Sequence, residues 1–218
     1  MCGRYSIAIE PAEIEARFGA KYLEAMKPRY NAAPSQPLPV ILNSDPRHVV
    51  FAAWGIRPVW MSRVAKKDGL INVRFETLRD KATFRADLEG RRCLVPADGF
   101  YEWKTDAGKK KILFRITRKD GKLFAFAGIW QEGPKEPGLL RRFAIITTAA
   151  DSFMQPIHSR MPVILDHDEE RAWIERDGEL SDFLRLLETP YSPALRAYEV
   201  SREVNRATVD TPEVMNPV

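Results

Sequence analysis

The stretch Arg92-Cys93-Leu94-Val95-Pro96-Ala97-Asp98-Gly99-Phe100-Tyr101-Glu102-Trp103 contains two β-rich runs, residues 93–97 and 100–104, on either side of Asp98-Gly99. Apolar residues dominate both runs, many of them β-branched or aromatic, which is typical of strands that face a protein core. Two consecutive strands of this kind predict that β-structure forms the centre of the fold.

Similar runs occur throughout the rest of the chain, at residues 4–9, 39–42, 49–54, 112–117, 123–130, 143–148 and 196–200. Between two of these runs, Lys119-Asp120-Gly121-Lys122 predicts a hairpin turn, because Asp-Gly tolerates the positive φ that tight turns require. The number of runs predicts a core dominated by strands.

Helices are expected at only three places. One begins at Pro11 and continues to Phe18, with Gly19 as its stop signal, and the others cover residues 168–176 and 179–187. We therefore predict an α+β fold, with curved antiparallel sheets forming a barrel-like core and a few peripheral helices.

Two segments are predicted to be loops. Residues 27–39 contain four prolines and are expected to form an extended loop, and residues 131–138 form a second loop with Pro and Gly. Neither segment has the length or composition of a flexible interdomain linker, and the sequence has no internal repeat. Residues 1–218 are therefore expected to form one domain.

The charges are distributed unevenly along the chain. Residues 1–130 contain 24 Lys and Arg against 14 Asp and Glu, a net charge of +10, whereas residues 131–218 contain 10 against 16, a net charge of −6. A concentrated positive charge suits a polyanionic partner, because Lys and Arg near a phosphate backbone gain affinity by releasing counterions. The alternative is that these are ordinary solvated surface charges.

The sequence predicts a cytoplasmic protein with no membrane segment. Its first ten residues have no basic region or signal-like apolar run, and no stretch approaches the ~18 apolar residues of a membrane span. Two cysteines, Cys2 and Cys93, fit a reducing compartment. They form no CxxC pattern and the three histidines are scattered, so we expect neither a metal site nor a cofactor.

Cys2 is the most distinctive candidate for chemistry. Removal of Met1, which is usual before a small second residue, would leave a free α-amine beside a thiol, with ordinary pKa values of about 7.7–8.0 and about 8.5. Such a 1,2-aminothiol reacts with an aldehyde first as an amine, giving a Schiff base, and then as a thiolate, closing a thiazolidine. The alternative is that Cys2 is an inert small residue at the start of a strand.

Three further residues are candidates with two interpretations each. Glu102 lies between two aromatic residues, and burial there would raise its pKa toward that of a proton shuttle, whereas a glutamate on a solvated strand face would do nothing. His158, close to Arg160 in a proline-bounded loop, is either structural or a proton donor. Taken alone, Asn72 suits a strand edge and Arg74 a surface position.

Six segments together resemble the SOS-response-associated peptidase (SRAP) family, in order and over most of the chain. They are Met1-Cys2-Gly3-Arg4-Tyr5, Arg29-Tyr30-Asn31-Ala32-Ala33-Pro34, Trp54-Gly55 followed by Pro58 and Trp60, Asn72-Val73-Arg74-Phe75-Glu76-Thr77, Arg92 to Trp103, and His158-Ser159-Arg160-Met161-Pro162. Each segment is a weak signal, but six in register are specific.

The resemblance implies an enzyme that forms a covalent crosslink with abasic sites in single-stranded DNA during the DNA damage response. It assigns the crosslinking nucleophile to Cys2 and its catalytic companions to Asn72, Glu102 and His158. DNA contacts are implied for Arg4, Arg74, Trp60 and Arg160, with Trp60 against the bases. We expect a monomer whose partner is abasic DNA and which joins the nucleoid when bound.

Three other functions compete with this one. A thiol peptidase that uses Cys2 with His158 and either Glu102 or Asn72 is the main alternative, and it would need only the thiolate. A module that binds single-stranded DNA without chemistry would give salt-sensitive affinity and no covalent product. Glutamine amidotransferases also begin Met-Cys-Gly, but they need an oxyanion-binding Asn-Gly, and this sequence has no such dipeptide.

Overall fold

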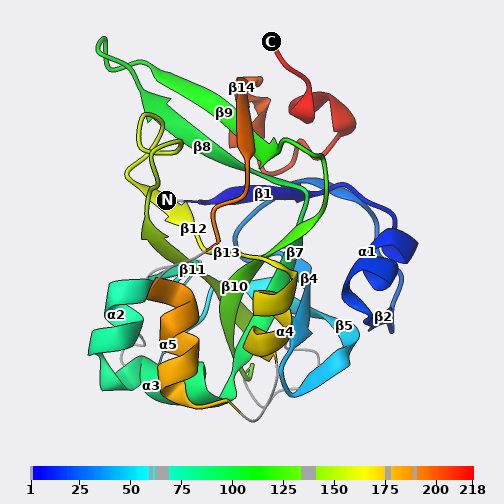
Figure 1. Cartoon of the computed structure of the whole chain (residues 1–218). Helices are drawn as coiled ribbons and strands as arrows, with labels where there is room; N and C mark the ends of the chain where they lie inside the picture. The colour runs from blue at the N-terminus through cyan, green and yellow to red at the C-terminus, as the bar shows by residue number, and fades with distance from the viewer. Residues whose placement is uncertain (1, 59–60, 62–68, 134–140, 175–177, 189–190) are drawn as a thin grey trace.

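The computed structural model describes residues 2–58, 61, 69–133, 141–174, 178–188 and 191–218. Its strands form two curled sheets around a ring-like core, and most of the helices lie beside the larger sheet in the lower half of Figure 1. The predicted α+β class, with barrel-like β-structure and peripheral helices, is confirmed. No helix of the described part of the chain is long and apolar enough to span a membrane.

The first sheet carries the N-terminus. Its five strands are antiparallel and follow the order β14-β9-β8-β1-β3. Their bounds are Leu195–Glu199 for β14, Lys111–Arg118 for β9, Gly99–Thr105 for β8, Arg4–Ile7 for β1 and Arg29–Ala32 for β3. Because β1 pairs with β8, the first residues of the chain lie beside residues 99–101.

The second sheet has the order β12-β11-β10-β7-β4-β5-β2, and β6 and β13 pair with it at β11 and β10. The bounds are β2 Lys21–Tyr22, β4 Pro37–Leu42, β5 Asp45–Trp54, β6 Asn72–Arg74, β7 Arg92–Ala97, β10 Phe124–Gln131, β11 Arg142–Ala149, β12 Arg160–Pro162 and β13 Ile164–Leu165. Most pairs are antiparallel, but β6 and β5 run parallel to β11, and β2 runs parallel to β5.

Residues 92–103 join the two sheets. β7 belongs to the second sheet and β8 to the first, and the chain crosses between them at Asp98, whose N–H donates to the Ser6 carbonyl at 3.0 Å. Gly99 follows at once, and a Cβ there would lie 2.9 Å from the Arg115 guanidinium. A side chain at this crossing would therefore force the Arg115 guanidinium to shift.

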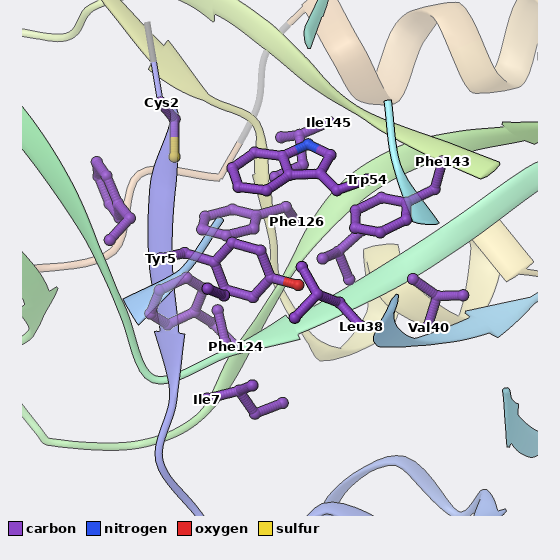
Figure 2. Packing of buried hydrophobic residues seen from close by; sticks show 14 of the residues in the cluster. Cys2, Tyr5, Ile7, Leu38, Val40, Trp54, Phe124, Phe126, Phe143 and Ile145 are labelled. Atoms are coloured by element: carbon purple, nitrogen blue, oxygen red, sulfur yellow. The ribbon is translucent and has the colours of Figure 1, made fainter. Parts of the chain in front are cut away.

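The space between the sheets is filled by a cluster of aromatic residues. Tyr5 on β1 lies edge-on to Trp54 and Phe126, with ring centroids 5.2 and 6.0 Å apart, and Trp54 stacks on Phe143. Figure 2 shows the Cys2 side chain pointing into the same cluster. Side chains from both sheets thus hold the N-terminal strand in place, at roughly 1.5–3 kcal/mol for each large apolar group buried.

Within the described ranges, five α-helices lie around these sheets. α1 (Pro11–Phe18) ends as predicted, at Gly19 with φ 68°. α4 (His167–Ile174) and α5 (Leu180–Glu188) also occupy the predicted segments. Two more, α2 (Phe75–Asp80) and α3 (Ala82–Gly90), were not predicted. Buried residues of these last four helices share one apolar cluster with the second sheet.

Two local expectations are wrong. The proline-rich segment 27–39 contains β3 and the start of β4, which is possible because Pro37 and Pro39 pair only with β5 and lie before the point where β7 joins. At Lys119-Asp120-Gly121-Lys122 there is a turn, with Gly121 at φ 69°, but β9 and β10 belong to different sheets, so no hairpin forms.

The C-terminal segment, with its short helices η2 (Arg202–Asn205) and η3 (Pro212–Met215), is tied to β3. The Asn31 Nδ2 donates to three backbone carbonyls of this segment, those of Val204, Arg206 and Val209, at 3.2, 3.0 and 2.9 Å. Asp210 accepts from the Asn31 N–H at 2.8 Å and pairs with Arg29. The end of the chain therefore braces the sheet that carries the N-terminus.

Candidate functional site

Cys2 lies directly before β1 and is fully buried. Its Sγ donates to the Arg4 carbonyl at 3.5 Å. Burial raises the pKa of the Cys2 thiol, and the negative charge of Glu102 raises it further. In this environment the thiol keeps its proton, so Cys2 is not a ready-made thiolate nucleophile.

Asn72 connects the second sheet to Cys2. It begins β6, whose parallel pairing places Asn72 beside Ile145 of β11. Its Nδ2 donates to the Cys2 carbonyl at 2.7 Å. The amide oxygen Oδ1 is buried and accepts no hydrogen bond from the described part of the chain. The side chain thus fixes the backbone of Cys2 with one end and has an acceptor available at the other.

Glu102 approaches Cys2 from the first sheet. Arg4 of β1 pairs with Tyr101 of β8, so Glu102 is the next residue along β8 in the direction of Cys2. Its side chain is only 1% exposed, and burial raises the pKa of Glu102. The positive charge of the N-terminus, and after it that of His158, opposes this effect of burial. Of the two interpretations of this residue, the buried carboxyl is the observed one.

His158 lies in the turn before β12, where its backbone N–H donates to the Met154 carbonyl at 2.9 Å. The His158 Nδ1 lies 3.0 Å from the backbone N of Arg160 and 3.1 Å from the Arg160 carbonyl oxygen. Nδ1 can therefore accept from this N–H or donate to this carbonyl, according to the tautomer of the ring. The backbone of Arg160 fixes the orientation of the imidazole.

The Arg160 side chain contacts Glu76 and Thr147. It forms a two-pronged ion pair with Glu76, at 2.6 and 3.0 Å, and donates to the Thr147 carbonyl at 2.6 Å. The hydrogen bond from Arg160 holds the pKa of Glu76 below its usual range. Sequence reasoning did not single out Glu76, although it lies in the quoted segment 72–77.

The remaining expected DNA contacts differ in their surroundings. Arg4 is partly buried, with its Nη1 donating to the Gly3 carbonyl at 2.9 Å. Arg74 is exposed and lies two residues after Asn72. Trp60 lies outside the residues that the structure describes. Arg4 follows Cys2 by two residues and Arg74 follows Asn72 by two. Because Asn72 is hydrogen-bonded to Cys2, both arginines belong to segments that meet at the candidate site.

Comparison with known proteins identifies the family. The family model described as SOS response associated peptidase (SRAP) matches residues 1–207. The chain belongs to the SRAP family. Two relatives from Bacillus subtilis are named abasic site processing proteins YoaM and YoqW. YoaM is 37% identical to this chain, and the match covers 99% of this chain and 98% of YoaM. YoqW is 38% identical, and the match covers 99% of both chains.

A solved structure has a similar fold over its whole length. A protein from Bacteroides thetaiotaomicron superimposes with a TM-score of 0.85, at 25% sequence identity, and covers 100% of both chains. The SRAP match ends at residue 207, so the last part of the segment that braces β3, including Asp210, lies beyond it.

The candidate site of this SRAP chain therefore combines a buried cysteine, an amide, a carboxyl group with a raised pKa and a histidine whose ring is held by the Arg160 backbone. Among the described residues, no group of three or more His, Cys, Asp or Glu side chains is arranged to hold a metal ion. The chemistry available to these four side chains is proton transfer and nucleophilic attack.

Proposed function

We propose that this protein recognises abasic sites in single-stranded DNA and forms a covalent thiazolidine crosslink with them through Cys2, after removal of Met1. The observation that carries the proposal is the meeting of Cys2 with Asn72, at 2.7 Å, and with a buried glutamate whose pKa is raised. The abasic site processing names of its SRAP relatives support the substrate. We further propose that residues 1–218 act as a single domain.

The substrate is the ring-opened abasic sugar, which carries an aldehyde. The neutral α-amine of Cys2 attacks the aldehyde carbon and forms a carbinolamine. Its hydroxyl is protonated and leaves as water, which gives a Schiff base. The thiol then adds to the same carbon through sulfur, its proton passes to nitrogen, and the five-membered ring closes. One C–N bond and one C–S bond form, and one water is released.

Glu102 is the proposed proton shuttle for these steps. A carboxyl group that is buried close enough to Cys2 to raise the pKa of its thiol, and whose own pKa is raised, is proposed to accept a proton from the attacking nitrogen and to return it to the departing hydroxyl. His158, whose ring is held by the Arg160 backbone through Nδ1, is proposed to protonate the sugar oxygen when the ring opens. Asn72 is proposed to fix the Cys2 backbone and to accept from the reacting groups with Oδ1.

The buried thiol favours amine-first chemistry over peptidase chemistry. A peptidase needs a thiolate at the start of its reaction, whereas burial raises the pKa of the Cys2 thiol. An amine-first path uses sulfur only in the second step, when the electrophile is already attached a few bonds away. The thiol peptidase remains the alternative function, and hydrolysis of peptides without a DNA adduct would favour it.

The proposed DNA contacts rest mainly on Arg4 and Arg74, which would hold phosphates beside the lesion. Trp60 is proposed to stack on a base. The Arg160 guanidinium is occupied by Glu76 and the Thr147 carbonyl, with 14% of the side chain exposed. Its proposed contribution to DNA binding is therefore smaller than that of the two other arginines.

The test is a denaturing gel of the processed protein with single-stranded DNA that carries one abasic site. We expect a shifted band that survives denaturation, no band with intact DNA, and none with Cys2→Ala. Cys93→Ala is the matched control, because Cys93 is equally buried but lies on β7, and it should crosslink like the parent. A band that persists when an uncleavable residue precedes Cys2 would refute the thiazolidine, because the amine would then be blocked.

A further inference from the structure

The hairpin formed by β8 and β9 extends beyond the strand that carries Cys2. The first paired residue of β1 is Arg4, opposite Tyr101, whereas β8 and β9 continue to pair as far as Thr105 and Lys111. Figure 1 shows the two strands projecting past the N-terminus to a tip at the edge of the molecule. This extension begins at the candidate site and leads away from it.

The tip of this hairpin is strongly basic. Residues 104–111 contain four lysines, Lys104, Lys109, Lys110 and Lys111, and a single acid, Asp106. Lys109 to Lys111 are exposed, and none of the four lysines has a carboxylate oxygen within 4.0 Å in the described part of the chain. The Asp106 carboxylate is used in the turn, where it accepts from the Lys110 N–H at 2.8 Å.

One of these lysines occupies a position that suits another residue type. Lys109 has φ 62°, a region of the backbone that favours glycine or asparagine and costs other residues of order 1–3 kcal/mol. The turn is held by local hydrogen bonds, among them the one from the Lys109 N–H to the Asp106 carbonyl at 3.0 Å. A lysine at this strained position is compatible with a role for its charge.

A hollow of about 390 Å³ lies at the base of the hairpin, lined by Trp103, Lys111, Leu113, Arg202 and Asn205. Its walls are ordered by two hydrogen bonds. The Trp103 indole N–H donates to the Asn205 Oδ1 at 2.9 Å, and the Arg202 guanidinium donates to the Lys111 carbonyl at 2.7 Å. A lining that combines the Trp103 indole with the cationic side chains of Lys111 and Arg202 suits a nucleobase and its phosphate.

The hollow and Arg4 lie on the same face of the first sheet. Side chains alternate along a strand, so Trp103 shares the face of Tyr101 and of its partner Arg4, whereas Glu102 faces the other way. From Trp103 to Thr105, the last residue of β8, the strand advances about 7 Å at ~3.3 Å per residue. The lysines of the turn that follows therefore lie beyond the hollow along the direction of the hairpin.

We propose that the β8–β9 hairpin and the hollow at its base bind the DNA strand on one side of the lesion, beyond the phosphates assigned to Arg4 and Arg74. The inference rests on the proposed function and extends it from the lesion to the flanking strand. The ligand is the sugar-phosphate backbone, held by the lysines, with one base in the hollow. Because these contacts are made to one flank only, the protein should depend on DNA length in a directional way.

The test compares Lys109→Gln/Lys110→Gln with Lys119→Gln/Lys122→Gln, which removes the same charge from exposed lysines of another turn. Each protein is tested on three abasic oligonucleotides. The shortest has one flanking nucleotide on each side of the lesion, and the other two add roughly ten nucleotides on the 5′ side or on the 3′ side. This length lies within the ~4–16 nucleotides that a small single-strand-binding fold covers. Crosslinking rates are measured at low protein concentration, and binding of the same strands without a lesion is measured across salt.

We expect the parent and the control to gain affinity from one of the two extensions, and the hairpin variant to lose most of this gain. Its log–log salt slope on the extended strand should fall by about 1.4, since each contact with single-stranded DNA contributes ~0.7. On the shortest oligonucleotide all three proteins should crosslink alike.

Equal behaviour of the hairpin and control variants on both extended strands would overturn the inference, as would a loss that is just as large on the shortest DNA. Failure of the parent to crosslink any abasic strand would refute the proposed function instead. In that case the binding of strands without a lesion still reports on the hairpin, because that measurement needs no chemistry.

Discussion

Glu102→Gln separates the chemical role of this carboxyl group from its structural role. Glutamine preserves the shape of the side chain, which is 1% exposed, but neither accepts nor donates a proton as an acid does. Loss of a general acid/base typically costs a factor of ~10²–10⁴. We therefore expect crosslink formation to slow by about a hundredfold or more, and reversal to slow as well, because the same proton transfers run backwards.

The same substitution should not destabilise the protein near neutral pH. Burial raises the pKa of Glu102, so the folded state binds this proton more tightly than the unfolded state does. This tighter proton binding contributes fully to the stability of the folded state below the ordinary glutamate pKa of about 4.3, and its contribution is lost as pH rises to the raised pKa of Glu102. Between these two pKa values the free energy of unfolding of the parent falls by up to about 1.4 kcal/mol per pH unit. The glutamine variant does not titrate and lacks this fall.

The assay pairs kinetics with unfolding. Time courses follow adduct formation on abasic single-stranded DNA and transfer of preformed adduct to a competitor aldehyde, and urea titrations at several pH values give the free energy of unfolding. Glu199→Gln, an exposed glutamate of the same sheet, is the control. Parent-like rates for Glu102→Gln would refute the shuttle, and a stability loss that does not vary with pH would make Glu102 a structural residue.

Three further substitutions test other contacts of the site and its support. Asn72→Asp replaces the donor 2.7 Å from the Cys2 carbonyl with a second acid, and it should slow crosslinking about tenfold, the equivalent of ~1.4 kcal/mol, in quenched time courses. Arg160→Ala removes the two-pronged pair with Glu76 and the contact with the Thr147 carbonyl, so unfolding in urea should show a loss of about 1–3 kcal/mol, and an unchanged midpoint would contradict the argument. Asn31→Ala, at a fully buried side chain that donates to three carbonyls, should cost a similar amount and increase proteolysis of the C-terminal segment, whereas Asn205→Ala, at an exposed position, should not.

Local structure was predictable wherever the chain gives a local signal. Gly19 marks the end of α1 with the positive φ that glycine tolerates, and period-two patterns located most of the long strands. The signals failed for α2 and α3. Neither helix has a capping side chain at its start, because Arg74 and Lys81 occupy the N-cap positions, and Lys81 both ends one helix and precedes the next.

Partners in space were not predictable from local patterns. The Asp120-Gly121 turn was visible, but whether β10 would pair with β9 or join the other sheet depends on packing of distant strands. The proximity of Cys2, Asn72, Glu102 and His158 came from family resemblance alone, since they are spread over most of the chain. The ion pair between Glu76 and Arg160, separated by 84 positions, had no sequence signal of its own.

The complete burial of Cys2 has a consequence for the timing of biosynthesis. The peptide bond that must be cut to free its amine lies directly before a residue with no exposed surface. His158 is made 156 residues after Cys2, which at ~5–20 residues per second takes roughly ten to thirty seconds. We expect an aminopeptidase to act during this interval, while the nascent N-terminus is still unpaired. A chain that folds before it is trimmed would then remain a dormant precursor, so the supply of active protein would be set at the ribosome.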